Sequence, residues 1–155
     1  MTSKKRVVLI TGAESGIGKS TSKIFLDNGY KVICTYLKNN NNKNTKDIEY
    51  HRIDITKNKD WENLALYIKK KFKKIDVLVN SAGVRLSGNL ETTSMSDWSY
   101  HLNNNVTGTF LACKYILPFL KKAKNSSIIS VASINSIRGC LLYTSDAADD
   151  GRRVD

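Results

Sequence analysis

Short strand-like runs alternate with longer amphipathic segments along the chain. The runs are bounded by glycine or polar residues and predict β-strands at residues 6–11, 31–36, 49–53, 75–80 and 127–132. Apolar residues at helical spacing, with capping signals near the ends, predict helices at residues 16–28, 60–72, 94–102 and 106–120. The polar segment 38–47 predicts a loop. This alternation is typical of βαβ units and a parallel sheet.

The pattern therefore predicts an α/β fold with three layers. The right-handed crossover rule places helices on both faces of the sheet. The chain has 155 residues, of which 41% are hydrophobic, which is enough for one packed core and too many for a disordered chain. We expect residues 1–139 to form a single domain.

A glycine-rich turn joins the first strand to the first helix. Gly12 permits a tight turn, Gly16 removes a side chain where the backbone must approach a pyrophosphate, and Gly18 lets the helix pack close to the strand. The N-terminus of that helix offers free N–H groups and a partial positive charge. Residues 11–18 therefore predict a dinucleotide-binding turn.

Further short motifs follow along the chain in order. They are Ile53-Asp54-Ile55-Thr56, Asn80-Ser81-Ala82-Gly83, Asn105-Val106-Thr107-Gly108 and Ser133. With the spacing T-G-x-x-x-G-I-G at residues 11–18, they resemble the short-chain dehydrogenase/reductase family over residues 6 to about 139. Ser81 departs from the family pattern, which has a second asparagine there. The resemblance implies a three-layer Rossmann fold with a parallel sheet, here truncated after about five strands.

The resemblance assigns these motifs to cofactor binding and catalysis. The implied cofactor-binding residues are Gly12, Ser15, Gly16, Ile17, Gly18, Asp54, Ile55, Asn80, Ala82 and Gly83. The implied catalytic residues are Ser133, which would hydrogen-bond the reacting oxygen, and Asn105, which would hold a water in the proton relay. Taken alone, Asp54 is equally a turn residue and Ser133 equally a helix cap. No metal site is expected.

The end of the second predicted strand bears on the choice of cofactor. Relatives that use NAD resemble one another in an acidic residue there, which bonds the ribose 2′-hydroxyl and repels a 2′-phosphate. Here the strand ends Cys34-Thr35-Tyr36-Leu37-Lys38, with no acid and a nearby lysine. Against NADP(H), Ser15 stands where many relatives that prefer it carry arginine. We expect NADP(H) to be favoured over NAD(H).

The family's catalytic tyrosine and lysine are not found at their usual spacing. In the family, the tyrosine exchanges the proton of the reacting oxygen, and a lysine four residues later lowers the pKa of that tyrosine. Tyr143 lies ten residues past Ser133, closer than in the family, and the position four after it is Ala147. No lysine follows Lys124.

The composition changes abruptly at Cys140. The eleven residues 140–150 resemble the translation of a transposase-type sequencing adapter, and the part of the adapter after its index accounts for residues 153–155. We therefore interpret residues 140–155 as a non-native tail and leave them out of arguments about the fold. We expect the gene to continue past Gly139 with a Tyr-x-x-x-Lys helix and further strands. The truncated chain should then be inactive and prone to aggregate.

Composition limits the other classes of function. The formal net charge is +11, but many lysines fall on helical faces without interleaved aromatic residues, so we expect no nucleic-acid partner. The apolar run at residues 7–10 is too short for a signal peptide or a membrane span. Three cysteines without metal-ligand spacing fit a reducing compartment. We expect a cytoplasmic protein with no membrane partner.

Two functions stay open from the sequence. The first is hydride transfer between nicotinamide and a carbonyl or secondary alcohol, with the 3-oxoacyl-carrier-protein reductase type as the nearest pattern. Its partner would be a small-molecule substrate, and the full-length form would be a homo-oligomer, a dimer or tetramer. The second is a nucleotide-binding sensor or regulator without catalysis, which the missing tyrosine–lysine pair favours. The native sequence after Gly139 would discriminate between them.

Overall fold

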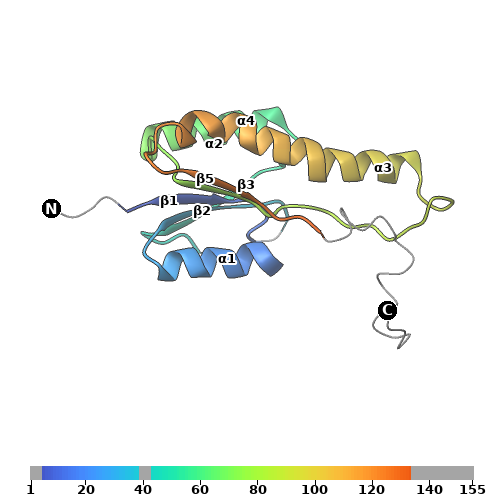
Figure 1. The fold of residues 1–155 in the computed structure, drawn as a ribbon, viewed down its shortest axis with the longest axis horizontal. Helices are drawn as coiled ribbons and strands as arrows, with labels where there is room; N and C mark the ends of the chain where they lie inside the picture. Colours follow the sequence, from blue (N-terminus) through green and yellow to red (C-terminus); the bar gives the residue numbers. More distant parts are fainter. Residues whose placement is uncertain (1–4, 39–42, 134–155) are drawn as a thin grey trace, which may run out of the picture.

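One parallel sheet organises the chain, with helices on both of its faces (Figure 1). The computed structural model describes residues 5–38 and 43–133. The elements are β1 (Val7–Ile10), α1 (Gly16–Asp27), β2 (Lys31–Tyr36), β3 (Ile48–Arg52), α2 (Asn58–Lys71), β4 (Val77–Asn80), α3 (Met95–His101), η1 (Leu102–Thr107), α4 (Gly108–Leu120) and β5 (Ser127–Ser130). The strand order is β3-β2-β1-β4-β5, and all neighbours are parallel. The predicted three-layer α/β fold is confirmed.

Strand β1 lies at the centre of the sheet and is buried on both faces. Val7 and Leu9 pack into the apolar cluster that α2 and α4 cover. Val8 and Ile10 point the other way, into the cluster on the α1 side. Successive side chains of a strand alternate between faces, so a strand covered on both sides must be apolar throughout. This explains the unbroken apolar run at the start of the sequence.

Helix α2 is anchored by a fully buried tryptophan. Trp61 has no exposed side-chain surface, and its Nε1–H donates to the carbonyl oxygen of Ile55 at 2.8 Å. Leu64 and Ile68 are buried on the same face, as the helical spacing predicts. The hydrogen bond attaches the helix to the segment after β3, which also contributes to the site described below.

The sequence pattern predicts separate helices at 94–102 and 106–120, and this is wrong in one respect. The helical path is continuous from Met95 to Leu120 because the π-helical turn η1 joins α3 to α4. The Gly108 N–H donates to the carbonyl oxygen of Asn103, five residues back. The three asparagines at 103–105 interrupt the apolar spacing without ending the helix, and a π-turn of this kind often marks a functional site.

The start of α3 is capped by the side chain of Ser94. The Ser94 Oγ accepts a hydrogen bond from the Asp97 N–H at 3.1 Å. The Asp97 carboxylate does not complete the usual reciprocal bond to the backbone, because it accepts from the Ser94 hydroxyl at 2.7 Å instead. The cap fixes where the long helix begins.

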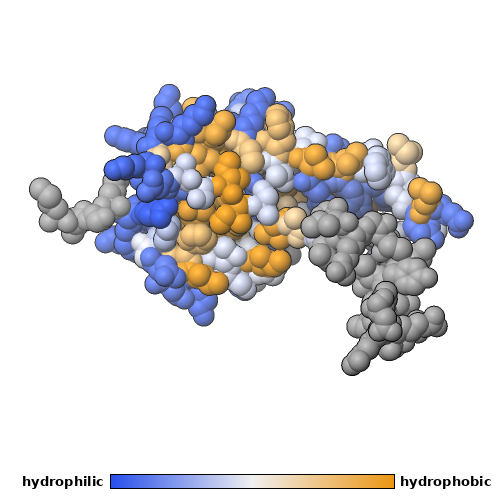
Figure 2. Space-filling view, viewed as in Figure 1, coloured by the Kyte–Doolittle hydropathy of each residue, from blue (hydrophilic) through white to orange (hydrophobic). Residues whose placement is uncertain are grey.

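Strand β5 is exposed although its two central residues are isoleucines. All four of its residues are exposed, with Ile128 and Ile129 at 46% and 47%. Hydrophobic residues gather across the face of the molecule that Figure 2 shows. Within the described residues, β5 pairs only with β4, so its other edge carries unpaired backbone groups. Among the residues that the structure describes, no helix is long and apolar enough to cross a membrane.

A buried carboxylate ties the edge strand β3 to α2. Glu49 is 7% exposed and accepts hydrogen bonds from the hydroxyl of Tyr67 and, at 2.7 Å, from the Lys71 ammonium. Burial acts to raise the pKa of Glu49, but the bonds from Lys71 and Tyr67 outweigh it and hold that pKa below its usual value. Burial has the opposite effect on the neighbouring His51, where it disfavours the charged form and lowers the pKa.

Acid is expected to remove the contribution of Glu49 to stability. Its folded pKa lies below the unfolded value of 4.5, so the contribution is complete above that pH and is lost as the pH falls through the folded pKa. Glu49→Gln should lower the free energy of unfolding by about 1–3 kcal/mol at neutral pH, and the difference should shrink towards pH ~3. Urea unfolding at several pH values measures it, with Glu62→Gln on the exposed face of α2 as the control. A difference that stays constant with pH would contradict this account.

Candidate functional site

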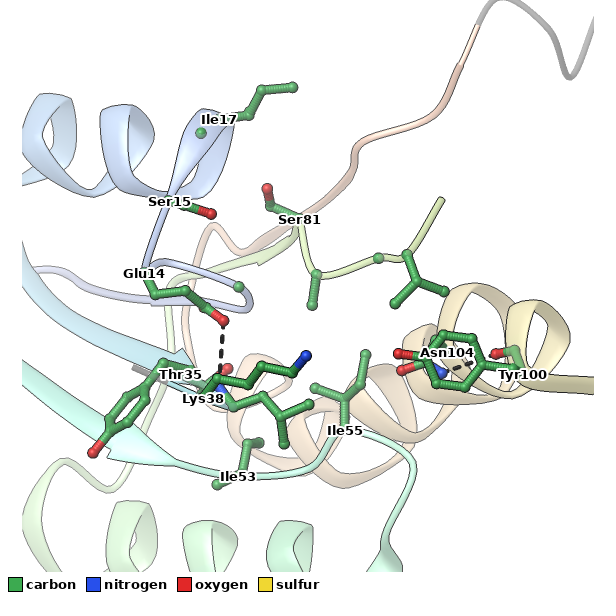
Figure 3. Close-up of a pocket in the computed structure, with 17 residues that line it drawn as sticks. Glu14, Ser15, Ile17, Thr35, Lys38, Ile53, Ile55, Ser81, Tyr100 and Asn104 are labelled. Carbon is green, nitrogen blue, oxygen red and sulfur yellow. Dashed lines mark hydrogen bonds between the residues drawn. The ribbon is translucent and has the colours of Figure 1, made fainter. Parts of the chain in front are cut away.

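A cavity of about 510 Å³ opens at the carboxyl ends of the strands. In open α/β sheets, ligands bind at this edge. The loops after β1, β2, β3 and β4 contribute to it, and the long helix closes one end (Figure 3). The lining residues are Gly12, Glu14, Ser15, Gly16, Ile17, Thr35, Tyr36, Leu37, Lys38, Ile53, Ile55, Ser81, Ala82, Gly83, Val84, Tyr100 and Asn104.

The glycine turn has the geometry that its sequence predicts. Gly12 has φ +65°, and a Cβ there would lie 2.7 Å from the Cα of Ala82. A Cβ on Gly18 would lie 2.3 Å from the carbonyl oxygen of Gly12, so only hydrogen lets α1 approach the turn this closely. Gly16 has φ +51°, and no atom lies within 4 Å of where its Cβ would be. Gly16 also lines the cavity, so a ligand there can approach its backbone.

The first turn of α1 offers hydrogen-bond donors at the cavity. Ser15 is the residue that precedes the helix, and its side chain makes no capping bond. The N–H groups of Gly16, Ile17 and Gly18 belong to the first turn, where an α-helix supplies no acceptor. Ser15, Gly16 and Ile17 all line the cavity. A diphosphate fits this set of donors, because anions bind at helix N-termini.

Thr11 joins the loop after β1 to the loop after β4. Its Oγ1 accepts hydrogen bonds from the N–H groups of both Ser81 and Ala82, each at 3.0 Å. Thr11 is 2% exposed, so these bonds are shielded from water. Thr11 begins the predicted turn at residues 11–18, but it was not named among the predicted cofactor-binding residues.

Asp54 holds a turn. Its Oδ1 accepts from the N–H and the hydroxyl of Thr56, at 3.0 and 2.7 Å, and its own N–H donates to Asp60. Burial acts to raise the pKa of Asp54, but the bonds from Thr56 and the nearby Lys57 hold that pKa below its usual value. Asp54 does not line the cavity, whereas its neighbour Ile55 does. A direct contact of Asp54 with a cofactor therefore stays a prediction.

Gly108, the last residue of the motif in the long helix, allows close packing against the segment after β3. A Cβ on Gly108 would lie 2.6 Å from the Cδ1 of Ile55. Glycine at this position lets the Ile55 side chain rest against α4 while it forms a wall of the cavity (Figure 3).

The segment Asn80–Gly83 divides into a buried anchor and a cavity wall. Asn80 is 4% exposed, and its Nδ2 donates to the Ser130 Oγ at 3.1 Å, which links β4 to β5. It does not line the cavity, while Ser81, Ala82 and Gly83 do. Asn80 was predicted to bind the cofactor. Its observed contacts place it outside the cavity, where it supports the segment that forms the wall.

Asn105 secures the loop after β4 from the π-helical turn. Its Oδ1 accepts from the Val84 N–H at 2.8 Å, and its Nδ2 donates to the Val84 carbonyl oxygen at 3.0 Å. The same Oδ1 would lie 3.1 Å from a Cβ on Gly83, so glycine leaves room for this contact. Asn105 and the loop after β4 are thus one unit, and the predicted catalytic role of Asn105 stays a prediction.

Ser133, the other predicted catalytic residue, is exposed and lies three residues beyond β5. It is the last residue that the structure describes, and it does not line the cavity. Tyr143 and the interpreted tail at 140–155 lie outside the described residues. Among those described, no group of three or more His, Cys, Asp or Glu side chains could hold a metal ion.

Several lining residues were missed by the sequence analysis as site residues. Tyr100 and Asn104 close one end of the cavity, and the Asn104 Nδ2 donates to the Tyr100 carbonyl oxygen at 2.8 Å. Glu14 comes from the glycine turn and points into the cavity (Figure 3). Glu14 is an unspecified position of the glycine motif, whereas Tyr100 and Asn104 lie outside every motif, so the sequence patterns did not single them out. Lys38 was noticed for its charge, and it does line the cavity.

Comparison with known proteins relates this geometry to relatives. The family model for short chain dehydrogenase matches residues 6–147. The chain is similar to 3-ketodihydrosphingosine reductase of Bacteroides thetaiotaomicron, with 31% identity over 134 residues that cover 86% of this chain and 49% of the relative. It is also similar to 3-oxoacyl-[acyl-carrier-protein] reductase FabG of Thermotoga maritima, with 32% identity over 142 residues that cover 86% and 58%. The chain thus spans about half the length of the curated relatives it matches.

Solved structures match the fold and show bound nicotinamide dinucleotides. A variant of ElxO with NADPH bound has a TM-score of 0.80 and 32% identity, covering 88% of this chain and 59% of that one. A short chain dehydrogenase from Leptospira borgpetersenii with bound NAD+ has a TM-score of 0.82 and 25% identity, covering 90% and 56%. The family match covers most of the sequence, and it includes the glycine turn and the segments after β3 and β4 that line the cavity. The chain therefore belongs to the short-chain dehydrogenase/reductase family of oxidoreductases.

Proposed function

We propose that the complete protein transfers hydride between a nicotinamide dinucleotide and a carbonyl or secondary alcohol. The observation that carries this proposal is the glycine turn: an open approach at Gly16 and unpartnered helix N–H groups face a cavity at the carboxyl edge of the sheet. Similar structures hold NADPH or NAD+.

The lining residues suggest how the dinucleotide is held. Gly16 and the first turn of α1 would bind the diphosphate. Ile55, Ala82 and Gly83 offer an apolar slot for the adenine ring, with Asp54 supporting the turn beneath it. Thr11 would hold the Ala82 side of this slot against the glycine turn.

When bound, the cofactor supplies or accepts the hydride. Ser133 would then donate a hydrogen bond to the reacting oxygen, which stabilises the negative charge that develops there. Asn105 would position a water for the proton relay from the π-helical turn. The proton itself must come from a group of suitable pKa, and the family's tyrosine with its lysine is not present at the expected spacing in this chain.

The exposed strand β5 supports the proposal that residues 140–155 are a non-native tail. A parallel strand with two exposed isoleucines normally has sheet and helix neighbours. The chain also spans only about half of its relatives. We infer that residues 1–139 are an incomplete Rossmann domain, and that the complete protein adds the tyrosine, the lysine and the cover over β5.

The substrate class rests on the relatives. Two of them are named for the reduction of a 3-keto compound, one a 3-ketodihydrosphingosine and the other a 3-oxoacyl chain on a carrier protein. A 3-oxoacyl thioester is therefore the first substrate to test. We place the complete protein in the cytoplasm, as a homo-oligomer that acts on small molecules rather than on nucleic acid or membrane.

A second function is a nucleotide-binding sensor or regulator without catalysis. It is favoured by one observation, the absence of Tyr-x-x-x-Lys after Ser133 in this sequence. The native codons after Gly139 separate the two functions, because an enzyme of this family requires that pair.

Lys38 supports a preference for NADP(H). It lines the cavity just after β2, and it is the only lysine or arginine among the lining residues. An ammonium there would attract a 2′-phosphate on the adenosine ribose.

The preference predicts the outcome of a binding measurement. The chain should bind NADPH more tightly than NADH, and Lys38→Gln should weaken NADPH binding by about tenfold while NADH binding changes by less than about twofold. Isothermal titration calorimetry measures both, with Lys59→Gln on α2 as a charge-matched control. Tighter binding of NADH by the unaltered chain would overturn the preference.

The truncation predicts a loss of activity. The 155-residue chain, given NADPH and a 3-oxoacyl thioester, should show no reduction above the rate without protein. The protein extended with its native sequence past Gly139 should reduce the substrate, and changing its tyrosine to phenylalanine should abolish that activity. The absorbance of the reduced nicotinamide follows the reaction. Soluble 155-residue chain that reduces the thioester would contradict the account.

A further inference from the structure

Glu14 brings a carboxylate to the place where β2 ends. It lies in the loop between β1 and α1, and its Oε1 accepts from the Leu37 N–H at 3.4 Å. Figure 3 shows its side chain pointing into the cavity, on the side that Lys38 also occupies. The sequence after β2 has no acid, but the fold supplies one from a segment more than twenty residues earlier.

The Glu14 carboxylate has unused capacity to accept hydrogen bonds. Its Oε2 is shielded and has no hydrogen-bond partner among the described residues. The bond from Leu37, at 3.4 Å, is longer than a usual N–H···O bond and therefore weak. A carboxylate oxygen removed from water without a donor is unfavourable. A small rotation would let this group accept from a ligand hydroxyl.

Glu14 and Lys38 are the only charged side chains among the residues that line the cavity. They make no ion pair within the described residues, so neither neutralises the other by direct contact. A sugar diol can donate to the carboxylate, whereas a phosphate dianion cannot and is repelled. Lys38 has the opposite effect on the phosphate. The two residues therefore oppose each other at one subsite.

We propose that Glu14 is a specificity-determining residue, whose carboxylate accepts from a ribose hydroxyl and opposes a 2′-phosphate. This inference rests on the proposed binding of a nicotinamide dinucleotide in the cavity. In relatives that use NAD, an acidic residue at the end of the second strand disfavours NADP(H). In this chain, the corresponding carboxylate comes from the glycine turn instead. The net preference for NADP(H) is consequently smaller than the preference that Lys38 alone would give.

Substitution of Glu14 by its neutral isostere tests the proposal. Glu14→Gln keeps the size and one acceptor but removes the charge, so NADPH should bind about tenfold more tightly. NADH binding should change by less than about twofold, because glutamine still offers a carbonyl oxygen. Calorimetric dissociation constants for NADPH and NADH give the ratio of affinities. Glu62→Gln removes the same charge from the exposed face of α2 and should leave that ratio unchanged.

Two shorter probes confine the effect to the ribose. Adenosine 2′,5′-bisphosphate and adenosine 5′-monophosphate differ only by the 2′-phosphate, so Glu14→Gln should strengthen the first and not the second. The gain should diminish at high salt, because screening weakens a charge–charge effect. If the 155-residue chain aggregates, the same variants in the protein with its native continuation past Gly139 give the same comparison.

The outcomes separate this inference from the proposed function. An unchanged NADPH-to-NADH ratio in Glu14→Gln overturns the role of Glu14 and leaves dinucleotide binding intact. Tighter NADH binding by the unaltered protein, with a shifted ratio in the variant, overturns the NADP(H) preference and supports Glu14. Absence of binding by either dinucleotide to folded protein overturns both.

Discussion

One hydroxyl group holds together the two loops on which the cavity depends. The Thr11 Oγ1 accepts from two successive backbone N–H groups after β4. At Gly12 the turn lies so close to Ala82 that no side chain would fit between them. Both contacts are short and shielded, so the distance between the glycine turn and the opposite wall is fixed before any ligand arrives. Pre-organisation of this kind reduces the entropy lost on binding. The positions of the helix donors and the apolar slot follow from that spacing.

Much of the fold could be predicted from local pattern. The five strands and the helices lie close to the predicted bounds, because β1 is covered on both faces and α2 buries a single stripe. The tight turn at Gly12 and the close packing at Gly18 were predicted correctly, since positive φ and close backbone approach leave few other residue types possible. The exception is the junction at 103–105, where polar spacing resembled a break but the helix continues through a wider turn.

The site was predicted less completely than the fold, for a physical reason. Motif positions identify residues whose backbone or size is constrained, and several of these turn out to support the cavity from outside. Asp54 bonds Thr56, Asn80 bonds Ser130, and Asn105 bonds Val84. Other residues that line the cavity, such as Glu14 and Asn104, are not specified by any of the motifs. Their importance depends on contacts between segments distant in sequence, which only the folded chain reveals.

The central position of β1 has a consequence for synthesis on the ribosome. β1 is made first, and it pairs on one side with β2, as in Val8 with Val32, soon afterwards. Its other edge pairs with β4, Val8 with Val77, and must wait until most of the first half of the chain has emerged. During that interval the most apolar strand has an open edge. The three-strand unit β3-β2-β1, covered by α1 on one face, is thus the assembly that must stay soluble while translation proceeds.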